Sequence, residues 1–456
     1  MRRCFRGGDT CANRWYIDET LSEVNSYDRS SSYPDVLVNC SFPVTPFVEC
    51  SQKITIDYLE KLITKRQRAV IMRVRFTRVS LKNKYWGDPY LTKDKSRNIS
   101  ADAEIMNGRI LSASSLETVI TEVDYWIIKE IYNFDMEILQ WFKASKGMLP
   151  DCFRDYIKVL YRKKTELKGL TGSTPGETEY NERMYGKAKA LLNSVYGMTA
   201  TSPIKEMIEY LKEDRDFHYA VSDQAELFAE CKERYWIPYE WGIYCTAWAR
   251  FRLFEGIRLV TQNQNIIGPG FSDFVYCDTD SVKYLGSADW TEYNARRIAD
   301  SQDNGAFATD RKGQVHYMGV YEEEHPMEKF RTCGSKKYAF LIDGKLHVTI
   351  AGVDKKLGGI ELAEKGGIDA LKDGFVFRKA GGLCAKYNDF PETDHVEIDG
   401  HQLTITSNCY LFESEYTLGT LELYKRILYM SKIDLDRIER IMYNEFTAGQ
   451  AEYIDS

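Results

Sequence analysis

The sequence predicts an α+β fold centred on an antiparallel hairpin. A run of apolar residues precedes Asp278, Thr279 and Asp280, and a second run follows them. Aspartate is common in tight turns because its side chain bonds to the neighbouring backbone. Residues 275–285 are therefore expected to form two short strands joined by a turn. The fold class also rests on a strand of alternating apolar residues at 70–79 and on helical stretches at 151–167 and 175–196.

The two carboxylates in this turn predict a metal site. Asp278 and Asp280 are separated by one residue, and their mutual repulsion is unfavourable unless a cation relieves it. Hard carboxylate oxygens suit Mg²⁺ or Mn²⁺. The alternative is a solvated surface turn, which is the more common meaning of an isolated Asp-x-Asp. Two further motifs, described below, favour the metal.

Length and composition indicate an ordinary globular protein of two or three domains. The chain has 456 residues, of which 43% are hydrophobic and 28% are charged. It contains no apolar run long enough to predict a membrane span, and its N-terminus lacks the apolar core of a signal peptide. The 11 cysteines form no Cys-x-x-Cys pair. We therefore expect free thiols, a cytoplasmic location and no membrane partner.

The distribution of charge is more informative than its sum. The net charge of −7 counts mildly against a nucleic-acid partner, because phosphate binding depends on Lys and Arg. Basic residues nevertheless gather at residues 61–84 and 162–168, while acidic residues gather elsewhere, as at residues 322–324. We expect a polarised surface with a basic channel. For residues 61–68 a solvated helix face is the alternative.

The two helical stretches are expected to form a helix hairpin. The first, residues 151–167, has an apolar stripe along one face and is followed by Gly169. The second begins with a Thr-x-x-Glu capping box at Thr174, has Pro at its first position and is expected to end at Gly197. Before these two helices, residues 119–142 are expected to form a strand and then a helix.

One face of the second helix suits a nucleoside triphosphate. Lys189, Asn193 and Tyr196 follow one another at helical spacing, so they share a face. An ammonium group can meet the phosphates, and a phenol ring can bound a base pair. Lys164 on the preceding helix is a second candidate phosphate ligand, with a basic helix end as the alternative.

Three motifs in order resemble the family B DNA polymerases. Asp-x-x-Ser-x-Tyr-Pro begins at Asp28 and is similar to motif A of that family. Lys-x-x-x-Asn-Ser-x-Tyr-Gly begins at Lys189 and is similar to motif B, and Tyr-x-Asp-Thr-Asp-Ser begins at Tyr276 and is similar to motif C. Motif A departs from the usual pattern, with Ser32 in place of Leu and Asp35 in place of Ser.

Other features resemble the protein-primed branch of the family, found in phages, adenoviruses and linear plasmids. Phe-Arg-Gly-Gly, which ends at Gly8, is similar to the element that joins the exonuclease of that branch to its polymerase, with Phe5 in place of Tyr. The run at residues 246–251 is also similar to that branch. Only 27 residues precede Asp28, so the resemblance implies the polymerase part without the exonuclease. We then expect exposed apolar surface near residues 1–12.

The resemblance implies a right-hand architecture with an antiparallel-sheet palm, two-helix fingers and a thumb. The expected regions are 1–40, the N-terminal junction and first part of the palm; 41–150, an insertion similar to TPR-1 of the branch; 151–200, the fingers; 201–236, an insertion similar to TPR-2; 237–351, the second part of the palm; and 352–456, the thumb and C-terminal tail.

The resemblance also implies roles for individual residues. The catalytic carboxylates would be Asp28, Asp278 and Asp280, which with Arg29 would form the metal group for two Mg²⁺ ions, with Mn²⁺ as an alternative. The nucleotide would be bound by Lys164, Lys189, Asn193, Tyr196 and Tyr33. Primer and template would be bound by Ser31, Lys336, Tyr338, Thr279, Gly7, Gly8 and Gly197.

The implied function is DNA-directed DNA synthesis. A deoxynucleoside triphosphate would be transferred to a primer 3′-hydroxyl or to a hydroxyl of a terminal protein, in the host cytoplasm if the protein is viral. The expected partners are primer–template DNA and nucleotides, with a terminal protein and a separate exonuclease subunit as further candidates. One alternative is another palm polymerase, such as a reverse transcriptase, but those enzymes lack the motif B helix. The other is a catalytically degenerate polymerase that binds nucleic acid.

Overall fold

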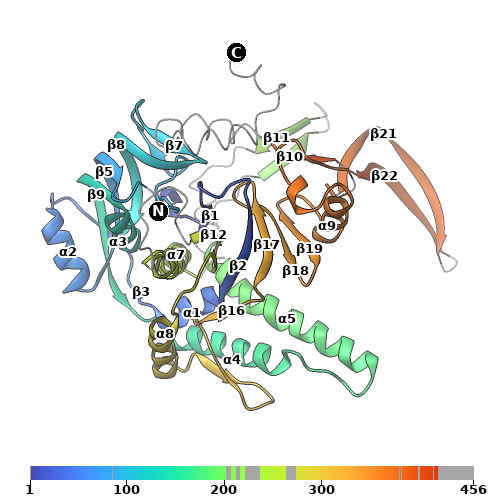
Figure 1. Cartoon of the computed structure of the whole chain (residues 1–456), viewed down its shortest axis with the longest axis horizontal. Helices are drawn as coiled ribbons and strands as arrows, with labels where there is room; N and C mark the ends of the chain where they lie inside the picture. The colour runs from blue at the N-terminus through green and yellow to red at the C-terminus, as the bar shows by residue number, and fades with distance from the viewer. Residues whose placement is uncertain are drawn as a thin grey trace.

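An eight-stranded antiparallel sheet lies at the centre of the computed structural model (Figure 1). Its order is β1-β12-β13-β2-β17-β18-β19, and β16 pairs with β2. The predicted hairpin is confirmed as β12 and β13, with β2 on its far side. The strands are β1 (Thr10–Ala12), β2 (Thr20–Arg29), β12 (Phe274–Asp278), β13 (Ser281–Tyr284), β16 (Tyr321–Glu323), β17 (Met327–Thr332), β18 (Lys337–Ile342) and β19 (Lys345–Ile350).

The structure describes residues 2–84, 86–201, 207–211, 216–220, 237–262, 274–378, 380–381, 383–398, 401–413 and 415–419. Strands β10, β11, β21 and β22 are described by their backbone alone. Most of the region expected to resemble TPR-2 and the tail after residue 419 lie outside the described residues.

A second, seven-stranded antiparallel sheet is formed within residues 42–147. Alternating residues of its central strand β5 are buried against α2 and α3, which confirms the half-buried strand predicted at residues 70–79. The prediction for residues 119–142 is half wrong, because the helix ends at Ile131 and the chain returns as a long strand paired with β5. The elements are β3 (Phe42–Pro43), β4 (Val48–Cys50), α2 (Ile56–Thr64), β5 (Arg68–Leu81), β6 (Ser96–Arg97), β7 (Glu104–Met106), β8 (Arg109–Thr121), α3 (Glu122–Ile131) and β9 (Tyr132–Gly147).

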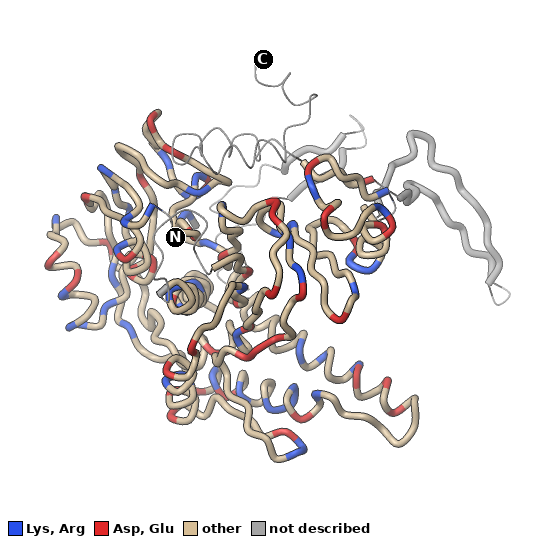
Figure 2. Tube along the Cα trace, viewed as in Figure 1, with Lys and Arg blue, Asp and Glu red and all other residues tan. Residues whose placement is uncertain are grey.

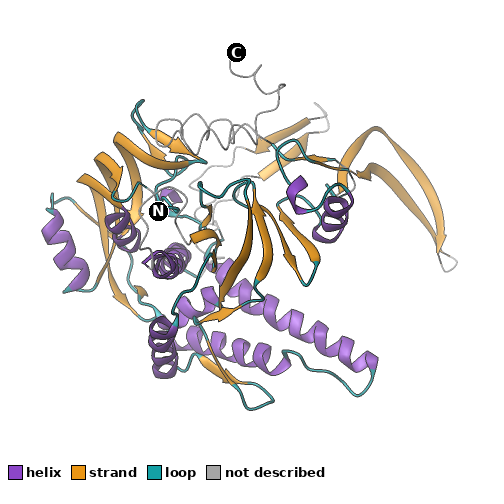
Figure 3. Ribbon diagram, in the orientation of Figure 1, coloured by secondary structure: helices purple, strands orange, loops and turns teal. Residues whose placement is uncertain are grey.

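Two antiparallel helices, α4 (Asp151–Leu167) and α5 (Pro175–Thr199), form the predicted helix hairpin (Figure 3). The α5 helix continues two residues beyond its expected end at Gly197. Thr174 Oγ1 accepts a hydrogen bond from the amide of Glu177, as a capping residue should. The Glu177 carboxylate, however, accepts from the amide of Ser173 rather than from that of Thr174, so the reciprocal half of the capping box is shifted by one residue.

Three further helices pack around the central sheet. The α7 helix, which contains residues 246–251, contacts β12 and β13. The α1 helix begins within motif A, at Ser32, and contacts α4, α5, α7 and α8. These contacts fix the helix hairpin against the sheet. The bounds are α1 (Ser32–Asn39), α7 (Tyr239–Gln262) and α8 (Thr291–Asn304).

The remaining elements are short, apart from one long hairpin that projects from the body in Figure 1. A two-stranded hairpin occupies part of the region expected to resemble TPR-2. The elements are η1 (Arg2–Cys4), β10 (Met207–Leu211), β11 (Asp216–Ala220), β14 (Phe307–Thr309), β15 (Val315–Tyr317), α9 (Lys355–Glu364), η2 (Ile368–Ala370), β20 (Val376–Phe377), β21 (Leu383–Ile398), β22 (His401–Glu413) and β23 (Tyr416–Thr417).

The surface near the N-terminus differs from the expectation. Exposed large apolar side chains were expected near residues 1–12, but among the described residues the first along the chain is Val44. Cys4 and Cys11 are buried, and Phe5 packs against Tyr239 with ring centroids 5.9 Å apart. The apolar side chains of this segment are thus covered by the chain itself.

Part of the basic stretch at residues 61–84 is neutralised within its own sheet. Figure 2 shows Lys and Arg interspersed with Asp and Glu over the second sheet. Arg73 and Arg75 reach Glu117 at 2.7 and 2.8 Å, and Arg75 also reaches Glu137 at 3.0 Å. Among the described residues no helix is long and apolar enough to cross a membrane, and the cysteines are free.

Candidate active site

Strand register places the motif A and motif C carboxylates in one line across the central sheet. Ser281 on β13 lies opposite Asp278 on β12 and opposite Asp28 on β2, and Asp28 in turn lies opposite Glu322 on β16. Directly opposed residues of antiparallel strands point to the same face. We call Asp278, Ser281, Asp28 and Glu322 the carboxylate row. Asp280, in the turn, joins it beside Asp28 through a hydrogen bond of 2.9 Å from the Arg29 amide to its carbonyl.

A second line of residues crosses the same face of the sheet, two residues along each strand from the carboxylate row. Lys283 lies opposite Tyr276 on β12 and opposite Ser26 on β2. The amide of Glu324 donates to the Ser26 carbonyl at 2.9 Å, and Ser26 Oγ donates to the Glu324 carboxylate at 2.5 Å. We call Tyr276, Lys283, Ser26 and Glu324 the lysine row. The site therefore contains the charged residues Lys283, Glu322 and Glu324 in addition to the three expected carboxylates.

Burial and neighbouring negative charges raise the pKa values of the Asp28 and Asp280 carboxylates. Burial raises the pKa of Asp28, and the charges of Asp280 and Glu324 raise it further. Burial also raises the pKa of Asp280, although Arg29 opposes this effect. Two part-buried carboxylates that repel one another form a site where a cation is favourable.

Asp278 has close partners of its own. The Lys336 ammonium donates to both of its carboxylate oxygens, at 2.9 and 3.1 Å, and Thr10 Oγ1 donates at 3.0 Å. The Lys336 amide donates to the Tyr276 hydroxyl at 2.9 Å. The lysine expected to hold the primer is thus placed beside the motif C turn by two contacts.

The donor set fits a divalent cation, with one correction. Among the described residues no three His, Cys, Asp or Glu side chains are already gathered as metal ligands. Asp28 and Asp280 nevertheless supply the hard oxygens that Mg²⁺ prefers. The side chain of Arg29 cannot serve as a ligand, because its cationic guanidinium is buried and pairs with Asp35. Only its main-chain carbonyl oxygen could join a metal group.

The helix hairpin brings basic and aromatic side chains to the carboxylate row. Lys164 Nζ donates to Ser31 Oγ at 2.9 Å. Burial lowers the pKa of Lys164, and the positive charges of Lys168 and Lys189 lower it further. Lys189 is exposed on the neighbouring helix, as is Asn193. Two lysines from different helices therefore face the same space.

Tyr33 of motif A and Tyr196 of motif B stack on one another. Their ring centroids are 4.0 Å apart and the rings are 16° from parallel. Burial raises the pKa of both hydroxyls, so both remain protonated. The stack joins α1 to α5, so motif A and motif B meet at these two rings.

The N-terminal junction packs against this stack and against the motif C turn. A Cβ atom on Gly8 would lie 2.8 Å from the Thr279 side chain and 3.0 Å from the Tyr33 hydroxyl, so the close approach requires glycine. The carbonyl of Gly7 accepts a hydrogen bond of 2.8 Å from Arg250. By contrast, Gly197 lies within α5 and nothing would obstruct a side chain there.

Three of the expected site residues have left-handed backbone conformations. The φ angles are 50° for Ser31, 64° for Thr279 and 56° for Lys336. A β-branched residue such as Thr is disfavoured there, and such strain clusters at functional sites. The Thr279 amide donates to the Asp9 carbonyl at 2.6 Å, which helps to hold the turn.

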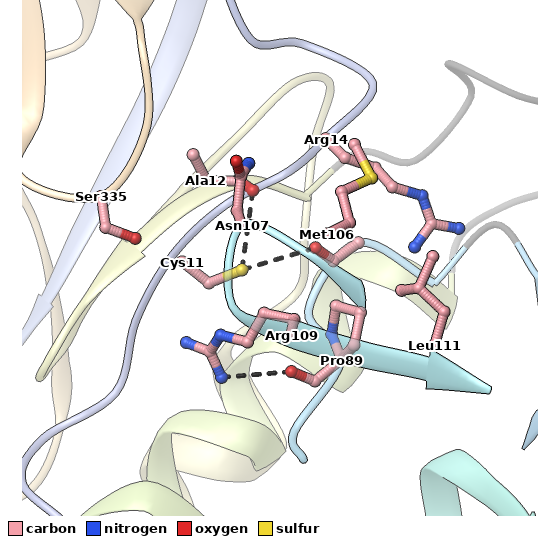
Figure 4. A pocket seen from close by; sticks show the side chains of 10 residues that line it. Cys11, Ala12, Arg14, Pro89, Met106, Asn107, Arg109, Leu111 and Ser335 are labelled. Atoms are coloured by element: carbon pink, nitrogen blue, oxygen red, sulfur yellow. Dashed lines mark hydrogen bonds between the residues drawn. The ribbon is translucent and has the colours of Figure 1, made fainter. Parts of the chain in front are cut away.

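Two cavities lie beside the junction. A groove of about 290 Å³ is lined by residues that include Gly7, Gly8 and Ser335. The neighbouring pocket in Figure 4, between Cys11, Met106 and Arg109, has a volume of about 20 Å³. The smaller pocket has room for about one water molecule and not for a substrate.

Sequence reasoning missed Lys283, Glu322 and Glu324. Lys283 could have been found from strand alternation, because it lies two residues after Ser281 and must share its face. The two glutamates could not have been found this way, because the pairing of β16 with β2 joins segments that are far apart in the chain. Tyr338 was expected at the site, and it packs on Tyr276 with centroids 4.8 Å apart.

The central sheet with its carboxylate row and the helix hairpin opposite it together define a protein of the right-hand polymerase class. Residues 1–242 match the model of the organellar and viral type B DNA polymerases. The chain belongs to this family, as the motifs predicted.

Individual relatives agree with the family. The chain is similar to the DNA polymerase of Bacillus phage Nf, at 25% identity over 289 residues that cover 63% of this chain and 43% of the relative. It is similar to the DNA polymerase of Bacillus phage phi29, at 22% identity over 310 residues that cover 63% of this chain and 42% of the relative. The chain thus spans less than half the length of these curated relatives.

Solved structures confirm the fold class. A phi29 DNA polymerase complexed with primer-template DNA superposes with a TM-score of 0.58 at 18% identity, covering 91% of this chain and 61% of that chain. A phi29 complex with primer-template DNA and incoming nucleotides gives a TM-score of 0.56 at 16% identity, covering 90% and 61%. The fold is therefore α+β with palm, fingers and thumb.

Proposed function

We propose that this chain is the polymerase part of a DNA-directed DNA polymerase. The observation that supports this most directly is that β2, the β12–β13 turn and α4 meet here: Arg29, next to Asp28, bonds to the Asp280 carbonyl, and Lys164 bonds to Ser31. Carboxylates and a lysine around one space suit phosphoryl transfer, which is mainly positioning and neutralisation of charge. DNA and deoxynucleotides as substrates are inferred from family membership and from the complexes of phi29 DNA polymerase.

Asp28 and Asp280 would hold two Mg²⁺ ions, with Mn²⁺ as the alternative. Asp278 and the carbonyl oxygen of Arg29 are the next nearest candidates. Bound metal would favour deprotonation of the primer 3′-hydroxyl and would neutralise charge on the triphosphate. The chain itself would contribute the fixed positions of the carboxylates, which the three paired strands β12, β13 and β2 determine.

The fingers would bind the nucleotide. Lys164 and Lys189 would contact the phosphates, and Asn193 lies between Lys189 and Tyr196 on the same helical face. The stacked rings of Tyr33 and Tyr196 would support the nascent base pair and its sugar. Base pairing with the template would choose the nucleotide, so no sequence-reading surface is required.

Primer and template would lie on either side of the motif C turn. Lys336 is half exposed, with 53% of its side chain accessible, so it could exchange Asp278 for a primer phosphate. Tyr338, Ser31 and Thr279 would support the primer end. Gly7 and Gly8, at the groove, would let the template backbone approach closely, and Gly197 would do so from the fingers.

The region boundaries are part of this proposal. The palm would comprise residues 1–40 and 237–351, the fingers 151–200 and the thumb 352–456. The seven-stranded sheet of 41–150 and the hairpin within 201–236 stand where the protein-primed branch carries its two insertions. Priming by a terminal protein is therefore proposed on position alone, and a separate exonuclease subunit remains a further candidate partner.

Primer extension with purified protein tests the function. The wild type should extend a labelled primer on a template when Mg²⁺ and deoxynucleotides are present, and EDTA should stop it. Asp280→Asn changes little volume but removes a metal ligand, so it should lower the rate at least about a hundredfold while primer–template binding persists. Template binding by the wild type without extension would instead support the degenerate alternative.

A further inference from the structure

Lys283 is a buried cation at the centre of the palm sheet. Its side chain is 4% exposed, in the middle strand of the group β12, β13 and β2. Lysine is seldom buried this completely unless charges of opposite sign surround it. Its position therefore requires a compensating environment.

The direct contacts of this ammonium group are weak ones. Among the described residues its hydrogen bond is to Ser281 Oγ, at 3.2 Å. The ammonium also lies 5.9 Å from the ring centroid of Tyr276 and 5.7 Å from that of Tyr338. Neither contact neutralises a full charge, although aromatic faces stabilise a cation.

The compensating charges belong to the neighbouring carboxylates. Glu324 is two strands away in the lysine row, on the far side of Ser26. Asp28 and Asp278 lie in the carboxylate row, two residues along their strands, and such same-face neighbours are about 7 Å apart. The charges of Glu324, Asp28 and Asp278 all favour the protonated amine against its burial.

The effect is mutual. Burial raises the pKa values of Asp28 and Asp280, and the charge of Lys283 opposes that rise. The positive charge of Lys283 also repels a second cation that approaches the same carboxylates.

We propose that Lys283 is a built-in counter-ion of the carboxylate row, buried beside it in the sheet, and that its positive charge weakens the binding of divalent cations there. It acts through Asp28, Asp278 and Asp280, so it is a positioning residue and not a catalytic one. The inference rests on the proposed metal site of the palm.

Lys283→Met tests this role, since Met keeps much of the side-chain length and removes the charge. Binding of Mn²⁺ to the full chain without DNA or nucleotide is measured by calorimetry. The variant should bind Mn²⁺ about tenfold more tightly than the wild type, because one repelling charge is gone. Its thermal midpoint in EDTA should fall, and added Mn²⁺ should raise that midpoint more than it does in the wild type.

Two control variants separate charge from packing. Lys283→Arg keeps the charge and should restore the affinity of the wild type. Lys345→Met removes an exposed lysine from the edge strand β19 and should leave Mn²⁺ affinity unchanged. A general effect of net charge would appear in both methionine variants.

The remaining outcomes are decisive. Equal Mn²⁺ affinity in wild type and Lys283→Met would overturn the counter-ion role. The role would also be overturned if Lys283→Met were unfolded at every Mn²⁺ concentration while Lys283→Arg bound Mn²⁺ like the wild type. The charge of the lysine would then be required for folding. If the wild type binds no Mn²⁺ and Asp280→Asn is no different, the proposed metal site itself fails, which is a separate result.

Discussion

Single residues at the site are held by contacts from distant parts of the chain. Thr279 is kept in a left-handed conformation by the Asp9 carbonyl and by the close approach of Gly8. Tyr33 is fixed between that same glycine and Tyr196. The junction, motif A, motif B and motif C thus meet at a few atoms, and small changes there should have specific effects.

Tyr33→Val should relax the choice of sugar. In the proposed function the Tyr33 ring supports the nucleotide sugar, and from that position it would exclude a 2′-hydroxyl. A smaller side chain removes that obstruction, so the ratio of kcat/KM for deoxynucleotide over ribonucleotide should fall about tenfold to a hundredfold. Single-nucleotide incorporation with each triphosphate measures the ratio.

A control variant in the stacked partner tests whether the change in sugar selectivity belongs to the Tyr33 ring. Tyr196→Phe keeps the stacked ring and removes only a hydroxyl, so its sugar selectivity should match that of the wild type. If Tyr33→Val retains the full selectivity of the wild type, then Tyr33 is not the residue that contacts the sugar.

At the scale of elements, the sequence predicted those helices and strands that depend on local spacing and turn residues. The helix at Asp151–Leu167, the alternation along β5 and the β12–β13 hairpin follow from spacing and turn residues, and each is confirmed. Residues 132–142 were expected to be helical, but their pairing with β5 across the second sheet outweighs local preference. Motif residues were predicted by resemblance, and Lys283 could have been predicted from strand alternation. The positions of Glu322 and Glu324 depend on the pairing of β16 with β2, which local sequence does not reveal.

Motif A also contains an ion pair that links β2 to the helix that follows it. Arg29 and Asp35 bond directly, and their side chains are 0% and 2% exposed. Arg29 also donates to Ser32 Oγ at 3.0 Å. A Cβ on Gly319 would lie 2.4 Å from the Asp35 carboxyl carbon, so the pair is enclosed on that side too. The two departures of this motif from the family pattern, at positions 32 and 35, are thus both partners of Arg29.

Asp35→Ser should therefore destabilise the protein strongly. The substitution leaves the Arg29 charge buried without its partner, which typically costs about 3–5 kcal/mol. Urea unfolding should show this loss in the free energy of unfolding. The double variant Arg29→Val with Asp35→Ser removes both charges and should recover part of it. Equal stability of Asp35→Ser and wild type would mean that the pair contributes nothing.

At the scale of the whole molecule, one buried carboxylate joins three separate regions. Asp124, at the start of α3, accepts a hydrogen bond of 2.7 Å from Arg250 on α7 and another from Tyr90. Arg250 also donates to the carbonyls of Arg6 and Gly7, each at 2.8 Å. The second sheet, the palm helix and the N-terminal junction therefore share one charged cluster, and the junction is placed at the groove by it.

This cluster predicts a specific loss of stability in acid. Burial alone would raise the pKa of Asp124, but the charges of Arg250 and Arg6 outweigh it and bring the pKa to about 2. The value in an unfolded chain is about 3.9. A carboxyl group whose pKa is lowered on folding contributes stability that is present above the unfolded value and is lost as the pH falls toward the folded value. Between pH 5 and pH 3 the loss from Asp124 should be about 1 kcal/mol.

Asp124→Asn isolates this contribution, because an amide does not titrate in this range. The variant should be less stable than the wild type at neutral pH, since Arg250 loses its buried partner. Its free energy of unfolding should then fall less steeply than that of the wild type between pH 5 and pH 3, by about 1 kcal/mol over the interval. Urea unfolding at a series of pH values measures both slopes. Parallel slopes would show that Asp124 titrates alike in the folded and unfolded chain, and that the cluster does not hold the three regions together by charge.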